Sequence, residues 1–345
     1  MKYRFLVFGA GAIGTYLGAS LIRQDHTVVF LERAADIQTL WEQGLRVELE
    51  GEVISIPEPQ LIDNLNEIQA GTFDLAILAL KTYHLEDMLP DLIRLRDQLP
   101  PLLCLQNGVE SEKILVNALG ADRVISGTVT TAVDRLGKGN IVVQRLRGMG
   151  LGGPHPLARE LVPIFKQAGI NCSYFPRAEQ MKWSKLVTNL LGNASSAILD
   201  LPPSTIFSHP DLYQMELDQI RETLDVMKFS GIKPVNLPGV PVKLLALIIK
   251  WIPAWISQPL LSKLIGSGRG NKMPSFHKDL YNGIGKSELD QLNGAVIRAG
   301  KKLNIPTPVN DFLVQTLNSL IRGEEKLDKY AHKPELFLDQ LAAGI

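Results

Sequence analysis

The sequence predicts an α/β domain built on a parallel sheet, followed by an all-helical domain. From Tyr3 to Pro176, short apolar runs alternate with helical patterns, as they do where parallel strands are joined by helices. After Pro176 the alternation stops, and amphipathic helices interrupted by prolines take its place. We therefore expect two domains in the 345 residues, over residues 1–176 and 177–345.

The composition is typical of a globular protein, because 45% of the residues are hydrophobic and 21% are charged. Lys and Arg together number 36, as do Asp and Glu, so the net charge gives no reason to expect nucleic acid. The two cysteines, Cys104 and Cys172, form no CxxC pair, so we expect neither a disulfide framework nor a metal site. The first apolar run reads as a strand rather than a signal peptide, which predicts a cytoplasmic location.

A glycine motif stands between the first predicted strand, Tyr3 to Phe8, and a helical pattern. It reads Gly9-Ala10-Gly11-Ala12-Ile13-Gly14. In a Rossmann fold the first glycine permits a tight turn, the second lets the backbone approach a pyrophosphate, and the third lets helix and strand pack closely. The motif therefore predicts a dinucleotide site; the alternative is a glycine-rich turn without a ligand.

The second predicted strand, Val28 to Leu31, ends in Glu32 and Arg33. This strand end contacts the adenosine ribose in such folds. Glu32 favours NAD, because a carboxylate accepts from a free 2′-hydroxyl, whereas Arg33 favours NADP, because it pairs with a 2′-phosphate. The local chemistry leaves both cofactors open.

Two further apolar runs end in polar residues. Leu75 to Leu80 is followed by Lys81, and Leu102 to Leu105 is followed by Gln106 and Asn107. Ligands of parallel sheets bind outside the carboxyl ends of the strands, so Lys81 and Asn107 are candidate contacts. The alternative is an Asn-Gly turn and a surface charge. More strands are expected at 124–129, 141–143, 148–152 and 171–175, with a helix over 156–168.

In the second domain, the stretch from Met181 to Ile198 is predicted to form one helix. Lys185, Asn189 and Asn193 recur every four residues and would form one polar stripe on it. A buried stripe of this kind is costly unless a polar group meets it. We interpret the stripe as the binding surface of a small polar substrate.

More helices are predicted over residues 212–230, 288–303 and 310–321. Ser287 resembles an N-cap, which places Glu288 in the first turn, where it would by itself be a surface acid that stabilises the helix dipole.

The segment over 234–270 is unusually apolar, yet Lys243, Lys250 and Pro253 interrupt it before it reaches the length of a membrane span. A subunit contact or a lid is the preferred interpretation. An ordinary buried helix and a membrane-surface anchor are the alternatives.

The ordered set of motifs resembles the ketopantoate reductase (2-dehydropantoate 2-reductase) family over nearly the whole chain. The set comprises the glycine motif, Lys81, Gln106-Asn107-Gly108, Lys182-Trp183-x-Lys185 with Asn189 and Asn193, Pro274-Ser275 with Asp279, and Ser287-Glu288-Leu289-Asp290 with Asn293-Gly294. The resemblance implies a Rossmann domain, a helical domain like the C-terminal domain of 6-phosphogluconate dehydrogenase, and a cleft between them. It also implies NADPH-dependent reduction of 2-dehydropantoate to pantoate, towards coenzyme A.

The resemblance assigns roles residue by residue. Lys185 matches the catalytic lysine, and Glu288 matches the acid that holds the substrate. Substrate-contacting or orienting positions are Asn107, Asn189, Asn193 and Ser275. The expected cofactor contacts are Gly9, Ala10, Gly11, Ala12, Ile13, Gly14, Arg33, Lys81, Asn107 and Glu288. Arg33 falls on the 2′-phosphate position, which favours NADP(H), although Glu32 beside it is less usual.

Two departures from the family pattern stand out. The 234–270 segment is longer and more apolar than in compact members, and the stretch from Asp279 to Glu288 is one residue longer. Either departure can change substrate preference without changing the chemistry.

In the mechanism that the resemblance implies, hydride transfer places negative charge on the oxygen of the substrate ketone, and Lys185 protonates that oxygen. The alternatives are a related reductase of another 2-oxo acid or of an imine, and a non-catalytic NADP-binding sensor. We expect a small-molecule 2-oxo acid as partner, no membrane, and either a monomer or a homodimer.

Overall fold

The structure is a computed structural model that describes residues 2–269 and 272–344, except for the side chains of residues 264–269. Met1 and Ile345, the ends of the two predicted domains, and Gly270, the end of the predicted apolar segment, lie outside the described residues. The chain divides into two compact units. Unit 1 comprises Met1–Lys182 and Leu237–Val240, and unit 2 comprises Trp183–Asn236 and Pro241–Ile345.

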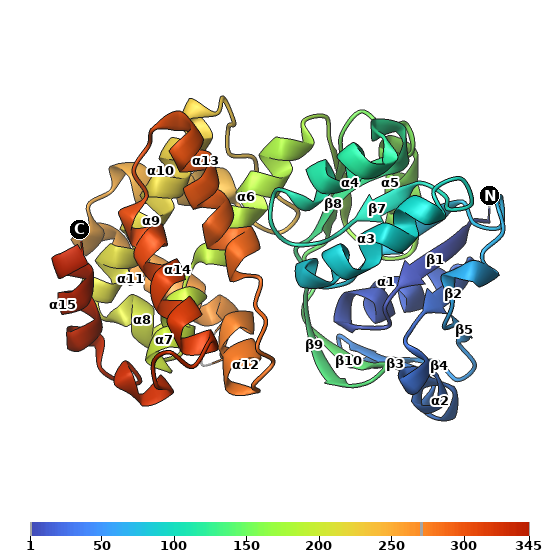
Figure 1. Cartoon of the computed structure of the whole chain (residues 1–345), viewed down its shortest axis with the longest axis horizontal. Helices are drawn as coiled ribbons and strands as arrows, with labels where there is room; N and C mark the ends of the chain where they lie inside the picture. The colour runs from blue at the N-terminus through green and yellow to red at the C-terminus, as the bar shows by residue number, and fades with distance from the viewer. Residues whose placement is uncertain (1, 270–271, 345) are drawn as a thin grey trace. The chain divides into compact units, whose positions relative to one another are not determined.

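Unit 1 is built on an eight-stranded sheet with the order β12-β11-β8-β7-β6-β1-β2-β5 (Figure 1). The sheet is parallel apart from the antiparallel pairing of β11 with β8. Its strands are β1 (Arg4–Phe8), β2 (Thr27–Leu31), β5 (Gln60–Ile62), β6 (Leu75–Leu78), β7 (Leu102–Cys104), β8 (Val124–Val129), β11 (Met149–Gly152) and β12 (Cys172–Phe175). The strand order reverses between β1 and β6, which is where open parallel sheets bind their ligands.

Helices cover both faces of this sheet, because successive side chains of a strand point to opposite faces. Phe5 and Val7 share a core with α1 (Ala12–Ile22) and α5 (Leu157–Gln167). Leu6 and Phe8 share the other core with α3 (Leu85–Arg94) and α4 (Ser111–Leu119). Every side chain of β6 is buried, as expected for a central parallel strand. The predicted α/β domain with a parallel sheet is confirmed.

A second, four-stranded sheet in unit 1 has the order β4-β3-β10-β9, and α1 packs against it. Its strands are β3 (Leu45–Leu49), β4 (Glu52–Ile56), β9 (Ala132–Gly137) and β10 (Asn140–Arg145), and α2 (Ala34–Gln43) precedes it. The sequence analysis predicted only residues 141–143 of this sheet. The β3–β4 hairpin had a readable signal, since apolar and polar residues alternate along β3, and the turn at Glu50 and Gly51 has φ values of +50° and +87°.

Unit 2 contains helices and no strands among the described residues, as predicted. The 20-residue helix α9 (Pro210–Phe229) packs against most of the others. The others are α6 (Ala178–Leu190, whose first residues belong to unit 1), α7 (Ala194–Leu199), α8 (Pro203–Ser208), α10 (Val242–Trp251), α11 (Ala254–Arg269), α12 (Ser275–Tyr281), α13 (Ala295–Leu303), α14 (Pro308–Ile321) and α15 (Pro334–Gly344). The predicted helices over 212–230 and 310–321 are confirmed, and the one over 288–303 is observed as a π-helical turn, Asp290–Gly294, followed by α13. In the described part of the chain, no helix combines the length and the apolar character needed to cross a membrane.

The prediction of one helix from Met181 to Ile198 is wrong. Helix α6 ends at Leu190 and α7 begins at Ala194, with Gly192 between them at a φ of +62°. That backbone conformation cannot continue a right-handed helix, and glycine adopts it without steric cost. The apolar periodicity runs through both helices, which is why the pattern concealed the break.

Candidate functional site

The polar residues of unit 1 meet at one edge of the large sheet because four strands end in register. Phe8 of β1 is paired with Leu31 of β2 and with Leu78 of β6, and Leu78 is paired with Cys104 of β7. The residues that follow these ends include Gly9, Glu32, Lys81 and Asn107. The parallel pairing therefore brings together the glycine motif and the two polar clusters, at the carboxyl ends of the strands as expected.

The geometry of the glycine motif fits a dinucleotide. Gly9 has a φ of +93°, and its amide donates to the Leu31 carbonyl at 3.0 Å. A Cβ on Gly14 would lie 1.9 Å from the Gly9 carbonyl oxygen, so only glycine fits there. A Cβ on Gly11 would meet nothing within 4 Å, which leaves open the approach to the start of α1. The first turn of α1 carries no acid, so its amides are available to an anion.

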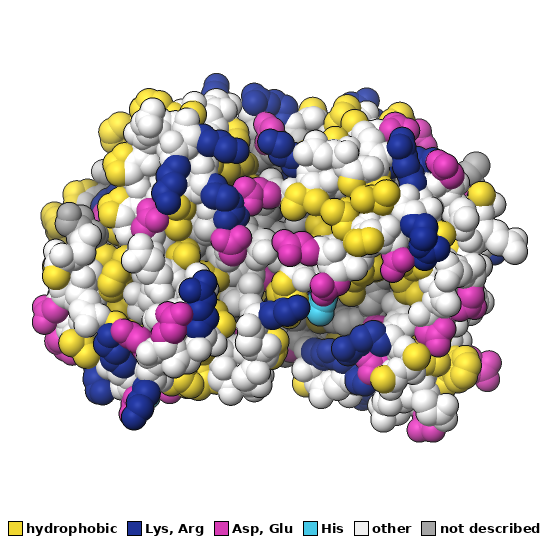
Figure 2. All heavy atoms as spheres, in the orientation of Figure 1, with side chains coloured by type: hydrophobic (Ala, Val, Ile, Leu, Met, Phe, Trp, Pro, Cys, Tyr) yellow, Lys and Arg dark blue, Asp and Glu magenta, His cyan; other side chains and the backbone are white. Residues whose placement is uncertain are grey.

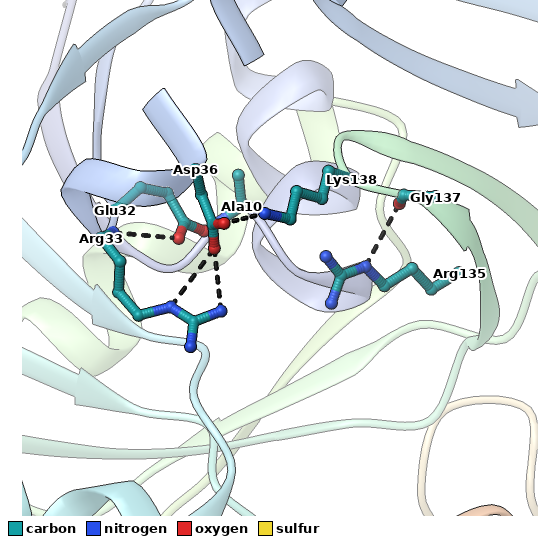
Figure 3. Close-up of polar contacts among 7 residues, drawn as sticks. All are labelled: Ala10, Glu32, Arg33, Asp36, Arg135, Gly137 and Lys138. Atoms are coloured by element: carbon teal, nitrogen blue, oxygen red, sulfur yellow. Dashed lines mark hydrogen bonds and ion pairs between the residues drawn. The ribbon is translucent and has the colours of Figure 1, made fainter. Parts of the chain in front are cut away.

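Charged side chains surround the end of β2 (Figure 3). One Glu32 carboxylate oxygen accepts from the Ala10 amide of the glycine motif. The Arg33 guanidinium donates to Asp36 of α2 through both Nε and Nη2, at 3.2 and 2.8 Å, and Lys138 pairs with the other Asp36 oxygen. Asp36 is buried, whereas the Arg33 side chain is 80% exposed.

Lys138 belongs to the turn between β9 and β10, and Arg135 lies on the same hairpin. Figure 2 shows Lys and Arg side chains gathered over this hairpin. The hairpin of the second sheet therefore adds basic groups to the Arg33 cluster. Sequence reasoning missed both residues, because they lie about 100 positions from Arg33 and no local pattern connects them.

The polar residues after β6 and β7 are tied to each other. Gln106 is buried, and its side-chain nitrogen donates to the Lys81 carbonyl at 3.4 Å. Lys81 and Asn107 are both half-buried, which argues against simple surface positions. Cys104, at the end of β7, is fully buried, and burial raises the pKa of its thiol far above the usual range. This thiol is therefore a core side chain rather than a nucleophile.

Lys182 fastens the start of α6 to the large sheet. Its ammonium donates to the carbonyls of Gln106 at 2.6 Å and Gly127 at 3.2 Å, and pairs with Glu112 of α4 at 2.6 Å. The Lys182 side chain is 5% exposed, so this lysine positions the helix and is not available to a substrate. The sequence analysis gave Lys182 no role of its own.

Lys185 and Asn189 lie one helical turn apart on the half-buried side of α6, whereas the residues on either side of Lys185 are buried. Thr188 lies on the same side, and its hydroxyl donates to the Lys185 carbonyl at 2.8 Å. This face presents an ammonium and an amide near a buried core, a combination that binds and polarises a carbonyl or carboxylate group.

Asn193 does not extend this stripe, because the helix breaks before it. Its side-chain oxygen accepts from the Phe276 amide at 3.2 Å, which fixes the start of α12 where Ser275 lies. Glu216 of α9 holds the break itself: it accepts from the Gly192 amide at 2.7 Å and from the Ser195 hydroxyl. Glu216 is fully buried, and sequence reasoning missed it. Asn193 therefore lies beside the start of α12, at which Ser275 is the first residue.

Glu288 is only 2% exposed, so it is not the solvated acid that its local sequence suggests. The Ser287 hydroxyl oxygen accepts from the Leu289 amide at 3.1 Å, but Leu289 is the N-cap of the helical turn that begins at Asp290. Ser287 and Glu288 therefore lie before the helix, and the prediction of Ser287 as its N-cap is wrong. A π-helical turn, Asp290–Gly294, follows before α13; such turns are frequent at functional sites. Within this turn, the side-chain nitrogen of Asn293 donates to the side-chain oxygen of Asn310 at 3.1 Å. The buried side-chain oxygen of Asn293 has no hydrogen-bond partner among the described residues.

Two family models match this chain, one in each half. The family model "Ketopantoate reductase PanE/ApbA" matches residues 5–154, and its C-terminal counterpart matches residues 177–320. The 2-dehydropantoate 2-reductase of Lactococcus lactis is 26% identical over 92% of this chain and 97% of that protein. The Pyrococcus horikoshii enzyme of the same name is 27% identical over 94% of this chain and 98% of its own.

Solved structures share the fold. A PanE/ApbA family ketopantoate reductase from Ralstonia eutropha JMP134 superposes with a TM-score of 0.78 at 24% identity, covering 94% of this chain and all of that one. A D-mandelate dehydrogenase bound to NADH and anilino(oxo)acetate has a TM-score of 0.75 at 21% identity, covering 94% of this chain and 99% of that one. The fold, the dinucleotide loop and the matches define an NAD(P)-dependent oxidoreductase. The chain belongs to the ketopantoate reductase PanE/ApbA family.

Proposed function

We propose that the protein reduces the ketone of 2-dehydropantoate to the alcohol of pantoate with hydride from NADPH, a step towards pantothenate and coenzyme A. The observation that carries this proposal is the half-buried Lys185, with Asn189 one turn later, in a chain whose other unit holds a dinucleotide loop. In this proposal unit 1 supplies most of the cofactor contacts and unit 2 most of the substrate contacts, while Asn107 and Glu288 take part in both sets. The match to two 2-dehydropantoate 2-reductases over more than nine-tenths of the chain supports the choice of substrate.

NADPH is proposed over NADH because of the charge around the end of β2. Arg33, Arg135 and Lys138 bring three cations to this region, and Asp36 neutralises only part of their charge. A 2′-phosphate pairs with such a cluster. Glu32 is already engaged by the Ala10 amide, which reduces its capacity to accept from a free 2′-hydroxyl.

In the proposed mechanism, hydride addition to the ketone places negative charge on its oxygen. The Lys185 ammonium donates a hydrogen bond to that oxygen and then transfers a proton to it, which completes the alcohol. Asn189 fixes the carbonyl group, and Asn193 orients the Ser275 end of the substrate site. Glu288 accepts from the substrate hydroxyl and also lies in the proposed cofactor contact set with Asn107 and Lys81.

The test measures NADPH oxidation with 2-dehydropantoate, with NADH in a parallel assay. We expect turnover that prefers NADPH. Lys185→Ala should lower kcat by at least about 100-fold while NADPH still binds, because the variant removes only the proton donor. Lys301→Ala, an exposed lysine of α13, is the matched control and should behave as wild type. Near-normal turnover of Lys185→Ala would show that another group is the acid, and turnover only with another 2-oxo acid would replace the substrate.

A further inference from the structure

Helix α10 turns apolar side chains outward as well as inward. Val242, Ala246 and Ile249 are buried against the unit, as in any amphipathic helix. On its solvent side, the exposed fractions are 55% for Leu244, 57% for Leu247 and 69% for Trp251. The solvent side of an amphipathic helix is normally polar. The outer face of α10 instead exposes three large apolar side chains together with Lys243 and Lys250.

The described part of α11 has its polar side turned towards the protein. Ser257 contacts the Tyr213 hydroxyl at 2.7 Å, and Gln258 and Ser262 donate to backbone carbonyls of α8. The opposite side exposes Trp255 at 77%, Ile256 at 49% and Leu260 at 52%. Apart from the buried Leu261 and the exposed Lys263, this polarity is the reverse of that of an ordinary surface helix. We call the six outward residues of the two helices the α10–α11 face: Leu244, Leu247, Trp251, Trp255, Ile256 and Leu260.

The charge of this part of the chain is one-sided. Residues 226–278 contain eight Lys and Arg residues and no Asp or Glu, although the whole chain has 36 of each kind. Lys243 and Lys250 are exposed on α10, and the Lys250 ammonium lies 5.2 Å from the centre of the Trp251 ring. Lys263 is exposed on α11. Lysines therefore accompany the apolar residues on both helices.

Helix α9 packs against α10 and α11 and carries the acids that precede them in the sequence; Asp279, which follows them, is buried. Asp218 is paired with Arg221 at 2.8 Å, and Glu222 accepts from the amides that begin α14. Asp225 is exposed. The acids of α9 are thus partly engaged by other groups and leave the surroundings of the α10–α11 face basic. Figure 2 shows hydrophobic side chains at the upper left margin of unit 2, with Lys and Arg side chains close to them.

The exposed apolar residues and the neighbouring lysines together favour one kind of partner for the α10–α11 face. In a two-fold dimer the same patch meets itself, so the lysines of one copy would face those of the other. An anionic bilayer instead accepts tryptophan and aliphatic side chains at its interface and attracts lysines to its headgroups. We propose that the α10–α11 face docks the protein on an anionic lipid surface, with the helices lying in the interface.

The test is co-sedimentation of the full chain with phosphatidylcholine vesicles that contain or lack phosphatidylglycerol. We expect binding to the anionic vesicles, weakened by salt because the lysine contribution is screened. Trp251→Ser/Trp255→Ser and Lys243→Glu/Lys250→Glu should each lower the partition coefficient at least about tenfold. The matched controls are Trp41→Ser, whose tryptophan is 58% exposed on α2, and Lys301→Glu/Lys302→Glu on α13; both should bind as wild type.

All substituted side chains are exposed, so enzyme turnover without vesicles should be unchanged and serves as the folding control. The proposal is overturned if wild type does not bind anionic vesicles, or if the face variants and their controls bind equally. It is also overturned if sedimentation shows a dimer that Trp251→Ser/Trp255→Ser dissociates and vesicles do not bind, since the face would then be an interface between copies. Failure of the vesicle test leaves the proposed reduction unaffected.

Discussion

The glycine loop of unit 1 and the break between α6 and α7 in unit 2 are both short turns before a helix, but they are held differently. In the loop, close packing of backbone groups dominates: the Gly9 amide donates to the Leu31 carbonyl, Gly14 packs against the Gly9 carbonyl, and the Glu32 carboxylate adds one bond from the Ala10 amide. In the break, a buried side chain, Glu216, binds the Gly192 amide and the Ser195 hydroxyl. The loop therefore depends mainly on Gly14, where no other residue fits, whereas the break depends mainly on one buried carboxylate that binds two groups.

The sharpest test of the glycine loop is Gly14→Ala. The added Cβ would overlap the Gly9 carbonyl, so we expect the free energy of unfolding to fall by about 4 kcal/mol or more. Gly11→Ala is the matched control, because it adds a Cβ in open space; its stability should stay within about 1 kcal/mol of wild type while NADPH affinity falls. Thermal unfolding and cofactor titration measure the two effects. Equal stability losses would show that the loop is not held by close backbone packing.

The corresponding test of the break is Glu216→Ala. It leaves a buried amide and a buried hydroxyl without their acceptor, and we expect a loss of about 3 kcal/mol in urea unfolding. Glu216→Gln keeps an acceptor of nearly the same shape and should lose less. If both variants unfolded like wild type, the break would be held by Gly192 alone.

The contribution of Glu222, a half-buried carboxylate of α9, to the stability of unit 2 should depend on pH. This carboxylate accepts from the amides of Val309 and Asn310 and from the Asn310 side chain, yet burial raises its pKa above the usual value of 4.5. Folding therefore favours the protonated form. Its contribution to stability is fully present below the unfolded-state pKa and is lost as pH rises through the folded-state pKa. The stability of wild type relative to Glu222→Gln should fall on going from about pH 4 to about pH 7 in urea unfolding. A constant difference would contradict the shift.

The smallest effect is expected at the exposed cofactor cluster. Arg33→Ala and Lys138→Ala should each raise the KM for NADPH about tenfold, with little change for NADH, because only NADPH carries the 2′-phosphate. Glu32→Gln is the companion variant and should change the NADH kinetics more than the NADPH kinetics. If Arg33→Ala raised the KM for NADPH and for NADH equally, the cluster would not recognise the 2′-phosphate.

The same contrast explains which parts of the fold and site were predictable. The end of each parallel strand is visible in the sequence, so the sequence alone predicts that Gly9, Lys81 and Asn107 lie at one edge of the sheet. Glu216, Lys182 and Lys138 act through contacts with residues far away in the chain, and no periodicity marks them.

The prediction that Asn193 continues the polar stripe of Lys185 and Asn189 is wrong, because the sequence pattern does not show where α6 ends. Apolar spacing continues through the break, and the glycine that ends α6 is isolated. An isolated glycine in a helical pattern lowers confidence in the helix and is a possible C-cap, so Gly192 was the one local signal.

The two buried cysteines have a practical consequence. Burial raises the pKa of Cys172 to about 12 and that of Cys104 still further, so neither thiol ionises near neutral pH. The native protein should therefore resist maleimide and mild oxidants. A single cysteine introduced at an exposed position would then react alone, which makes the chain a ready carrier for a fluorescent or spin label without prior removal of its own thiols.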